Sequence, residues 1–134
     1  MRRDVLRPGH DVERMFFPFD DHVDARHFGW YEGSKLLSVL SFLPQDREEA
    51  YSREAYRLRG MAVAPSYQGG GVGSRFLLEA LSSLKGQFDE VRLVWCNARV
   101  KAAGFYGRLG FEKKSEGFDI PGIGMHFVYE RKWF

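Results

Sequence analysis

The sequence has little of what several classes of protein require. Cys96 is the only cysteine among 134 residues, which excludes an internal disulfide and favours a reducing compartment. No apolar run reaches the roughly 18 residues of a membrane-spanning helix. The formal net charge of +2 comes without a basic run, which argues against nucleic acid as a partner. We therefore expect a cytoplasmic protein that contacts neither a membrane nor nucleic acid.

Metal-ligating residues are also sparse. His10, His22 and His27 lack the spacing of a metal site, and one cysteine cannot complete a zinc set with them, so no metal is expected. The bulk composition is that of an ordinary globular protein, with 44% hydrophobic and 28% charged residues. No repeat, low-complexity tract or linker divides the chain, and its length suits one domain. Residues 1–134 are therefore predicted to form a single domain.

Hydrophobic patterning predicts a mixed α/β (α+β) fold. Strands are expected at residues 26–31, 36–43, 55–63, 91–96, 111–117 and 125–133. An apolar stripe at helical spacing begins at Val72 and ends near Gly86, and a second helix is predicted over 98–108. The opening, residues 2–24, is irregular, with room for a short strand or a short helix. Because a helix separates the third strand from the fourth, at least one parallel crossover is expected in the sheet.

A glycine-rich segment separates the third predicted strand from the first predicted helix. It reads Gln68-Gly69-Gly70-Gly71-Val72-Gly73. Glycines let a ligand approach the main chain closely. The first turn of a helix offers N–H groups without intrahelical partners, at the positive end of the helix dipole. This combination predicts a site for a phosphate or pyrophosphate group.

Three phosphate-binding motifs compete for this segment. A Walker A loop needs a lysine after its last glycine, but Ser74 follows Gly73. The Rossmann pattern needs a third glycine where Phe76 stands, and the chain lacks the repeated βαβ units of that fold. Gln68, Gly71 and Gly73 match the third motif, Gln/Arg-x-x-Gly-x-Gly/Ala, in register. A flexible turn without a ligand is the remaining alternative.

A second segment makes the pattern specific to one family. Ala102-Ala103-Gly104-Phe105-Tyr106-Gly107-Arg108-Leu109-Gly110-Phe111 fits Ala-x-x-Phe/Leu-Tyr-x-x-x-Gly-Phe. Together with the glycine motif, it resembles the GNAT family of N-acetyltransferases, and in particular a small bacterial branch of unassigned substrate. The resemblance implies a twisted, mostly antiparallel mixed sheet flanked by helices, with a parallel strand–helix–strand core that binds the cofactor. It also implies that the N-terminal helical part of the family is shortened here.

The resemblance implies acetyl-CoA as the co-substrate, with its pyrophosphate on the glycine segment. The residues that it assigns to this ligand are Met61, Ala62, Val63, Gln68, Gly69, Gly70, Gly71, Val72, Gly73, Ser74, Asn97, Arg99 and Tyr106. Arg99 stands where many relatives have an asparagine that holds the pantetheine arm. Either Asn97 contributes this contact from the end of its strand, or Arg99 contacts a phosphate or the acceptor.

The reaction implied by the resemblance is direct attack of a primary amine on the acetyl thioester. A backbone N–H near Met61-Ala62-Val63 would polarise the carbonyl, and Tyr106 matches the general acid of the family. The alternative for Tyr106 is a structural tyrosine in an amphipathic helix. Glu54 is the carboxylate suggested as general base, against a solvated charge at a strand end. His126 is either a pocket residue or a structural histidine, and Cys96 is expected to be buried rather than nucleophilic.

Three functions remain compatible with these residues. The first is an N-acetyltransferase for a small-molecule or peptide amine. The second is a regulatory module that binds acetyl-CoA without turnover, and the third is a generic phosphate- or nucleotide-binding protein. Dimers are common in the family that the chain resembles, so a homodimer is considered as well. The acceptor amine is not readable from these motifs.

Overall fold

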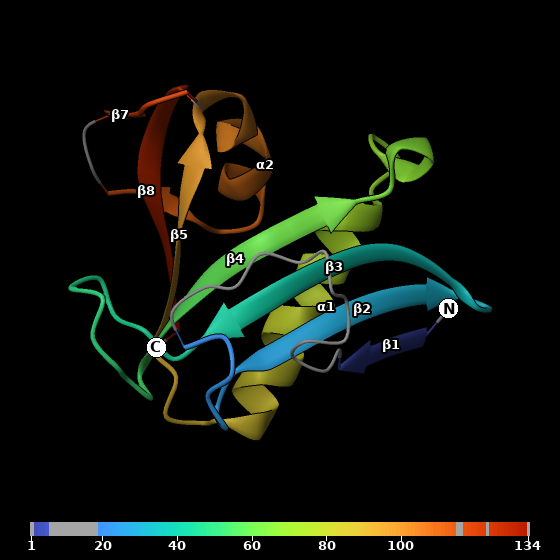
Figure 1. Cartoon of the computed structure of the whole chain (residues 1–134), viewed down its shortest axis with the longest axis horizontal. Helices are drawn as coiled ribbons and strands as arrows, with labels where there is room; N and C mark the ends of the chain where they lie inside the picture. The colour runs from blue at the N-terminus through green and yellow to red at the C-terminus, as the bar shows by residue number, and fades with distance from the viewer. Residues whose placement is uncertain (1, 6–18, 115–116, 123, 134) are drawn as a thin grey trace.

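The computed structural model describes residues 2–5, 19–114, 117–122 and 124–133 (Figure 1). Within these residues, one sheet has its strands in the order β1-β2-β3-β4-β5-β8-β6, and β7 pairs with β8. The strands are β1 (Arg2–Val5), β2 (Arg26–Glu32), β3 (Lys35–Leu43), β4 (Ala55–Val63), β5 (Leu93–Arg99), β6 (Glu112–Lys113), β7 (Phe118–Ile120) and β8 (Gly124–Lys132). The helical elements are η1 (Pro65–Tyr67), α1 (Val72–Gln87), η2 (Val100–Ala102) and α2 (Ala103–Arg108).

The pairing of the strands confirms the predicted fold class. The pair β4–β5 is parallel, and the other strand pairs are antiparallel. The first two predicted strands pair with each other as the hairpin of β2 and β3. The predicted parallel crossover runs from β4 through α1 to β5. No helix in the described parts of the chain is both long and apolar enough to cross a membrane.

Helix α1 lies behind β2, β3 and β4 in the view of Figure 1 and covers that face of the sheet. Its apolar stripe is buried and consists of Phe76, Leu77, Ala80, Leu81 and Leu84. These side chains form the main core together with inward-facing residues of β2 to β5. Burying one side chain of this size stabilises the fold by about 1.5–3 kcal/mol. The core therefore fixes where the first turn of α1 lies relative to the end of β4.

Strand β4 changes direction at a β-bulge. Val39 of β3 pairs with Ala62 and Ser41 pairs with Arg59, so Gly60 and Met61 together stand opposite a single residue of β3. Gly60 has a φ of +65°, in the left-handed region that glycine adopts without strain. A bulge of this kind bends its strand and increases the local twist.

Strands β4 and β5 separate shortly before β4 reaches this bend. Their parallel register runs from Ala55 with Leu93 to Arg57 with Trp95 and goes no further. Figure 1 shows the two strands diverging beyond that point. The edge of β4 from residue 58 to residue 63 thus has no strand beside it on the β5 side within the described residues. A cleft can form there between the two strands.

The predicted helix over 98–108 is wrong in its first part. Residues up to Arg99 belong to β5, which pairs with β8 from Leu93 to Arg99, and α2 begins only at Ala103. Pairing with β8 gives the backbone N–H and C=O groups partners and outweighs a weak local preference for helix. The prediction had ended the strand at Cys96, and so had placed Arg99 beyond the sheet.

The structure also corrects two boundaries near the end of the chain and settles an alternative at its beginning. In the predicted strand at 111–117, only β6 has strand structure among the described residues. The predicted loop before the last strand contains β7, which pairs with the beginning of β8. The opening of the chain includes the strand β1, paired with β2, which decides between the two alternatives for residues 2–5. The opening residues 6–18 lie outside the described residues.

Candidate functional site

The glycine segment leads from η1 into α1. Gly71 immediately precedes the helix with a φ of +85°, and no side chain among the described residues caps the helix start. The first turn also contains no acidic residue. The amide of Arg75 donates to the Gly71 carbonyl at 3.1 Å, so the amides before it, through Ser74, have no intrahelical acceptor. These amides can donate to an anion at the positive end of the helix dipole.

A cavity of about 440 Å³ adjoins this segment, and we call it the glycine-loop cavity. It is lined by Val63, Tyr67, Gln68, Gly69, Gly71, Gly73, Ser74, Phe105 and Arg108. A Cβ built on Gly69 or Gly71 would meet no atom within 4 Å, so these positions face open space. A Cβ on Gly73 would lie 3.3 Å from Cγ2 of Val63, because the helix approaches β4 closely there.

Arg108 supplies a positive side chain to the glycine-loop cavity. It belongs to α2, whose Phe105 also lines this cavity. The sequence alone assigns no role to Arg108, because this residue occupies a variable position of the second motif. Its place three residues after Phe105, about one turn of helix, was the only available signal. The proximity of α2 to the glycine segment depends on tertiary packing.

The end of β4 is held by side-chain hydrogen bonds. Ser38 Oγ donates to the Ala62 carbonyl at 2.9 Å, and Gln68 Nε2 donates to the Val63 carbonyl at 3.0 Å. The side chain of Gln68 therefore ties the glycine segment to the strand. Met61 and Val63 face the helix start, since both approach Gly73. The structure thus brings together the predicted residues of β4 and those of the glycine segment.

The space between β4 and β5 forms a second cavity of about 440 Å³, which we call the β4–β5 cleft. Its lining is Arg57, Leu58, Arg59, Gly60, Met61, Cys96, Asn97, Arg99, Tyr106, Ile120 and His126. A neighbouring cavity shares Met61, Asn97, Arg99, Tyr106 and His126 with it. The cleft is therefore built from β4, β5, β7, β8 and α2. Across the described ranges, no group of three or more His, Cys, Asp or Glu side chains is placed to hold a metal ion.

Tyr106 stands on α2 at the wall of the cleft. Its ring packs edge-on against Phe105 and Phe111, with centroids 5.0 and 5.4 Å away, and stacks on Tyr129 at 6.0 Å. Its hydroxyl hydrogen-bonds with the Cys96 thiol. Burial and the neighbouring Cys96 raise the pKa of Tyr106 above its ordinary value. The phenol therefore keeps its proton at neutral pH.

Cys96 lies at the base of the cleft, beside Tyr106. Its side chain is buried with 2% exposure, as expected from the sequence. Burial raises the pKa of the thiol to about 12, although Arg57 and the Tyr106 hydroxyl act in the opposite direction. A thiol with this pKa remains protonated at neutral pH and is a poor nucleophile. Its contact with Tyr106 was not readable from the sequence.

His126 lines the cleft from the beginning of β8. Its exposure is 7%, and its Nδ1 lies 2.9 Å from the Gly124 carbonyl oxygen. A carbonyl only accepts, so this contact assigns the proton to Nδ1. In the neutral ring, Nε2 then carries the lone pair and is the nitrogen that can accept a proton. Sequence analysis had left His126 open between a pocket residue and a structural one, and the structure places it in the cleft.

Asn97 and Arg99 extend from β5 into the cleft and share one face of the sheet with His126. Arg99 pairs directly with His126 across β5 and β8. Residues opposite each other in paired strands lie on the same face. Both predicted residues thus line the same cavity as Tyr106 and as Met61 near the end of β4.

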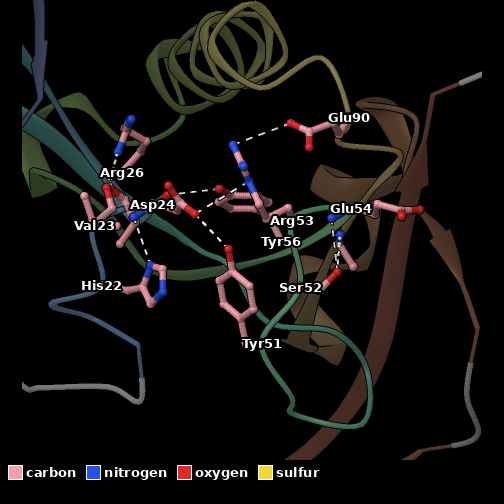
Figure 2. Close-up of polar contacts among 12 residues, drawn as sticks. His22, Val23, Asp24, Arg26, Tyr51, Ser52, Arg53, Glu54, Tyr56 and Glu90 are labelled. Carbon is pink, nitrogen blue, oxygen red and sulfur yellow. Dashed lines mark hydrogen bonds and ion pairs between the residues drawn. The ribbon is translucent and has the colours of Figure 1, made fainter.

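Glu54 lies apart from the other predicted residues. It immediately precedes β4, and its side chain is 66% exposed and pairs with Arg92 at 3.6 Å. From Glu54 to Met61 the chain runs roughly 20 Å along an extended strand. Figure 2 shows the Glu54 side chain pointing away from the neighbouring polar network. Glu54 is not among the residues that line the cleft.

The polar network beside Glu54 has a structural arrangement. The Tyr51 hydroxyl donates to Asp24 at 2.9 Å, and Arg53 lies 3.6 Å from the same carboxylate (Figure 2). Arg53 also reaches Glu90 at 3.5 Å, and the Tyr56 hydroxyl donates to the Asp24 carbonyl at 3.0 Å. These contacts join the start of β4 to the segments before β2 and after α1. They stabilise the end of the sheet where β4 begins, and none of these residues lines the cleft.

Comparison with known proteins gives a family match over most of the chain. A family model described as an acetyltransferase (GNAT) domain matches residues 24–113. The uncharacterized N-acetyltransferase YitI of Bacillus subtilis (strain 168) is 38% identical over 128 residues, which is 96% of this chain and 85% of that protein. The match includes the glycine segment and the motif around Tyr106.

Solved structures with low sequence identity share the fold. A variant of the spermidine N-acetyltransferase SpeG from Vibrio cholerae has a TM-score of 0.74 at 14% identity, over 98% of this chain and 95% of that one. An aminoglycoside 6'-N-acetyltransferase complexed with coenzyme A has a TM-score of 0.68 at 10% identity, over 83% of this chain and 74% of that one. At these identities, the likeness concerns the fold alone.

Proposed function

Because this chain belongs to the GNAT family of acetyltransferases, we propose that it transfers the acetyl group of acetyl-CoA to a primary amine by direct attack in a ternary complex. One observation carries the proposal. The glycine segment at the start of α1 and the half-buried Tyr106 line neighbouring cavities along the same strand, β4. A phosphate cradle and a proton donor are thereby arranged along one path.

The residues present fit acetyl-CoA. The uncapped first turn of α1 and the open positions at Gly69 and Gly71 would accept the pyrophosphate, with Arg108 as a cation beside it. The free edge of β4 would pair with the amides of the pantetheine arm, in the way that an extended peptide adds to a sheet edge. Acetyl-CoA, when bound there, supplies an activated acetyl thioester. Asn97 and Arg99 stand at the opposite wall for further polar contacts.

The side chains of the cleft would handle two protons. Tyr106 holds a proton on its hydroxyl at neutral pH and would deliver it to the sulfur as the carbon–sulfur bond breaks. His126 would take a proton from the amine at Nε2, directly or through a water, as the nitrogen–carbon bond forms. A backbone N–H on the free edge of β4 would stabilise the charge that develops on the carbonyl oxygen. We favour His126 over Glu54 as base because only His126 lines the cleft.

The proposal is tested by two measurements on the same protein. Calorimetry measures binding of acetyl-CoA, and a thiol-release assay with mass spectrometry measures acetylation across a panel of amines. We expect binding together with formation of an N-acetylated product. Binding without turnover on any amine would favour a regulatory module. Loss of both would contradict the acetyl-CoA site itself.

A further inference from the structure

The face of the sheet opposite α1 concentrates positive charge at the cleft. Arg57 and Arg59 of β4 and Arg99 of β5 all line it, together with His126. No aspartate or glutamate is among the described lining residues. A cleft that received a polycationic acceptor would need negative groups where this one has guanidinium groups. The positive charge of the lining therefore argues against a polycationic acceptor.

Arg57 is a buried cation with few partners. Its exposure is 8%, and its guanidinium carbon lies 4.6 Å from the centroid of the Trp95 ring. One terminal nitrogen, Nη1, reaches Gln45 Oε1 at 3.5 Å, and the Nε has no hydrogen-bond partner. Burial and the charge of Arg59 lower the pKa of Arg57 to about 10. Arg57 is thus still charged at neutral pH, desolvated, and held in place by the indole.

Among the described residues, the carboxylates near Arg57 do not pair with it directly. Glu130 shares the same face, opposite Trp95, but its carboxylate pairs with Arg47. Glu49, an exposed residue of the β3–β4 loop, acts on Arg57 through a charge interaction that raises the pKa of Arg57. Leaving a buried charge without a partner is costly, so such a group in a cleft is a candidate site for a ligand of opposite charge.

We propose that the acceptor is a primary amine that also carries an oxyanion group, a carboxylate or a phosphate, and that Arg57 binds this group. The inference rests on the proposed function. The flat fork of a guanidinium matches a carboxylate or a phosphate through paired hydrogen bonds. The anionic group then lies against β4 near Arg57 and Arg59, and the amine points along the strand toward Tyr106 and His126. Arg57 is a specificity-determining residue in this arrangement.

Matched pairs of amines test the inference. The panel consists of the standard amino acids with their α-amides, aminoethyl phosphate with aminoethanol, and spermidine as a polycation. The anionic member of the best pair is expected to have a kcat/KM about ten- to a hundredfold higher than its neutral partner, the range for a hydrogen bond to a charged group. The two pairs distinguish a carboxylate from a phosphate.

Variants of Arg57 assign the preference to this residue. In Arg57→Gln, the preference for the anionic member should fall to within about threefold, mainly through a higher KM for that member. Arg57→Lys should keep part of the preference and serves if the glutamine variant does not fold. Arg92→Gln is the matched control, since Arg92 is 75% exposed and lies outside the cleft. It should behave as the unaltered protein does.

Several results would overturn the inference. Neutral partners used as well as the anionic members in both kinds of pair would do so. Spermidine used as well as the anionic amines, or an Arg57 variant that loses both members of a pair equally, would do so too. If acetyl-CoA binds but no amine is acetylated, the proposed reaction fails. The anion site is then tested alone, by calorimetry of N-acetylated amino acids and their amides with the CoA-loaded protein. Equal affinities, or no binding of either, would contradict the anion site.

Discussion

The glycine segment and the arginine-bearing face of the cleft lie along the same strand, yet they offer different groups to a ligand. The glycine segment offers backbone amides of the first turn of α1. The face around Arg57 offers side chains that come from β4, β5 and β8. The first depends on a local run of residues and the second on strands far apart in the chain. A motif can therefore indicate the proposed cofactor end, whereas the proposed acceptor end becomes visible only in the folded sheet.

The largest expected effect is at the glycine segment, which offers backbone amides to the ligand. Gly71→Glu should abolish measurable binding of acetyl-CoA, a loss of more than about a hundredfold. The substitution strains a residue with φ +85° and places a negative charge at the positive end of the helix. Calorimetry measures the affinity, and Gly86→Glu near the other end of α1 is the control. Retained binding in Gly71→Glu would mean that the pyrophosphate does not lie on this segment.

The next effect concerns the proton donor between the two ends. Tyr106→Phe should lower kcat by about 10²–10⁴-fold, the usual range for general acid–base catalysis, with affinity for acetyl-CoA nearly unchanged. Tyr129→Phe removes a hydroxyl from the stacked neighbouring ring outside the cleft lining and serves as the control. Pre-steady-state measurement of the acetyl-transfer step separates chemistry from product release. An unaltered chemical step would remove Tyr106 from this role.

A smaller effect is expected at His126, whose side chain lines the β4–β5 cleft. His126→Gln should lower kcat/KM by about ten- to a hundredfold at neutral pH, because a base contributes less when water can replace it. Steady-state kinetics with the best amine of the panel measures this loss, and calorimetry should show nearly unchanged affinity for acetyl-CoA. An unaltered kcat/KM would argue that another group takes the proton.

The smallest effect is expected at Glu54. Glu54→Gln should change kcat/KM by less than about twofold and the free energy of unfolding by less than about 0.5 kcal/mol, as is usual for an exposed surface residue. Its exposed ion pair with Arg92 contributes little to the free energy of unfolding. Steady-state kinetics and denaturant unfolding measure the two quantities. A large loss of activity with intact stability would restore Glu54 as the base and would weaken the assignment of His126.

Local patterns predicted the elements that build the cofactor end. The apolar stripe of α1 and the glycines before it lie in one continuous stretch, and the helix begins at Val72 as predicted. The hairpin of β2 and β3 is likewise a local structure with a short turn. The prediction was wrong at residues 98–102, where local helix preference competes with pairing to β8, a strand that lies later in the chain. Sequence periodicity does not report that competition.

The positions of the acceptor-side residues were accessible only from the tertiary structure. The bulge at Gly60 and the early end of the β4–β5 register open the cleft, and neither has a mark in the sequence. Arg57 appears in the sequence as one of several charges on a strand, and only its burial against Trp95 distinguishes it. In the sequence, Glu54 looked equivalent to Arg57 as a charge on this strand. In the structure, it precedes β4 and does not line the cleft.

By itself, the sequence determined the family, the mixed sheet and the glycine segment proposed to hold a phosphate, because a run of glycines before a helix has nearly the same backbone chemistry in any setting. The tertiary structure decided which side chains meet in the cleft. Burial, charge pairing and the divergence of two strands are properties of residues that come together only on folding. The identity of a cofactor site can thus be written in consecutive residues, whereas selectivity for an acceptor depends on side chains brought together by the sheet.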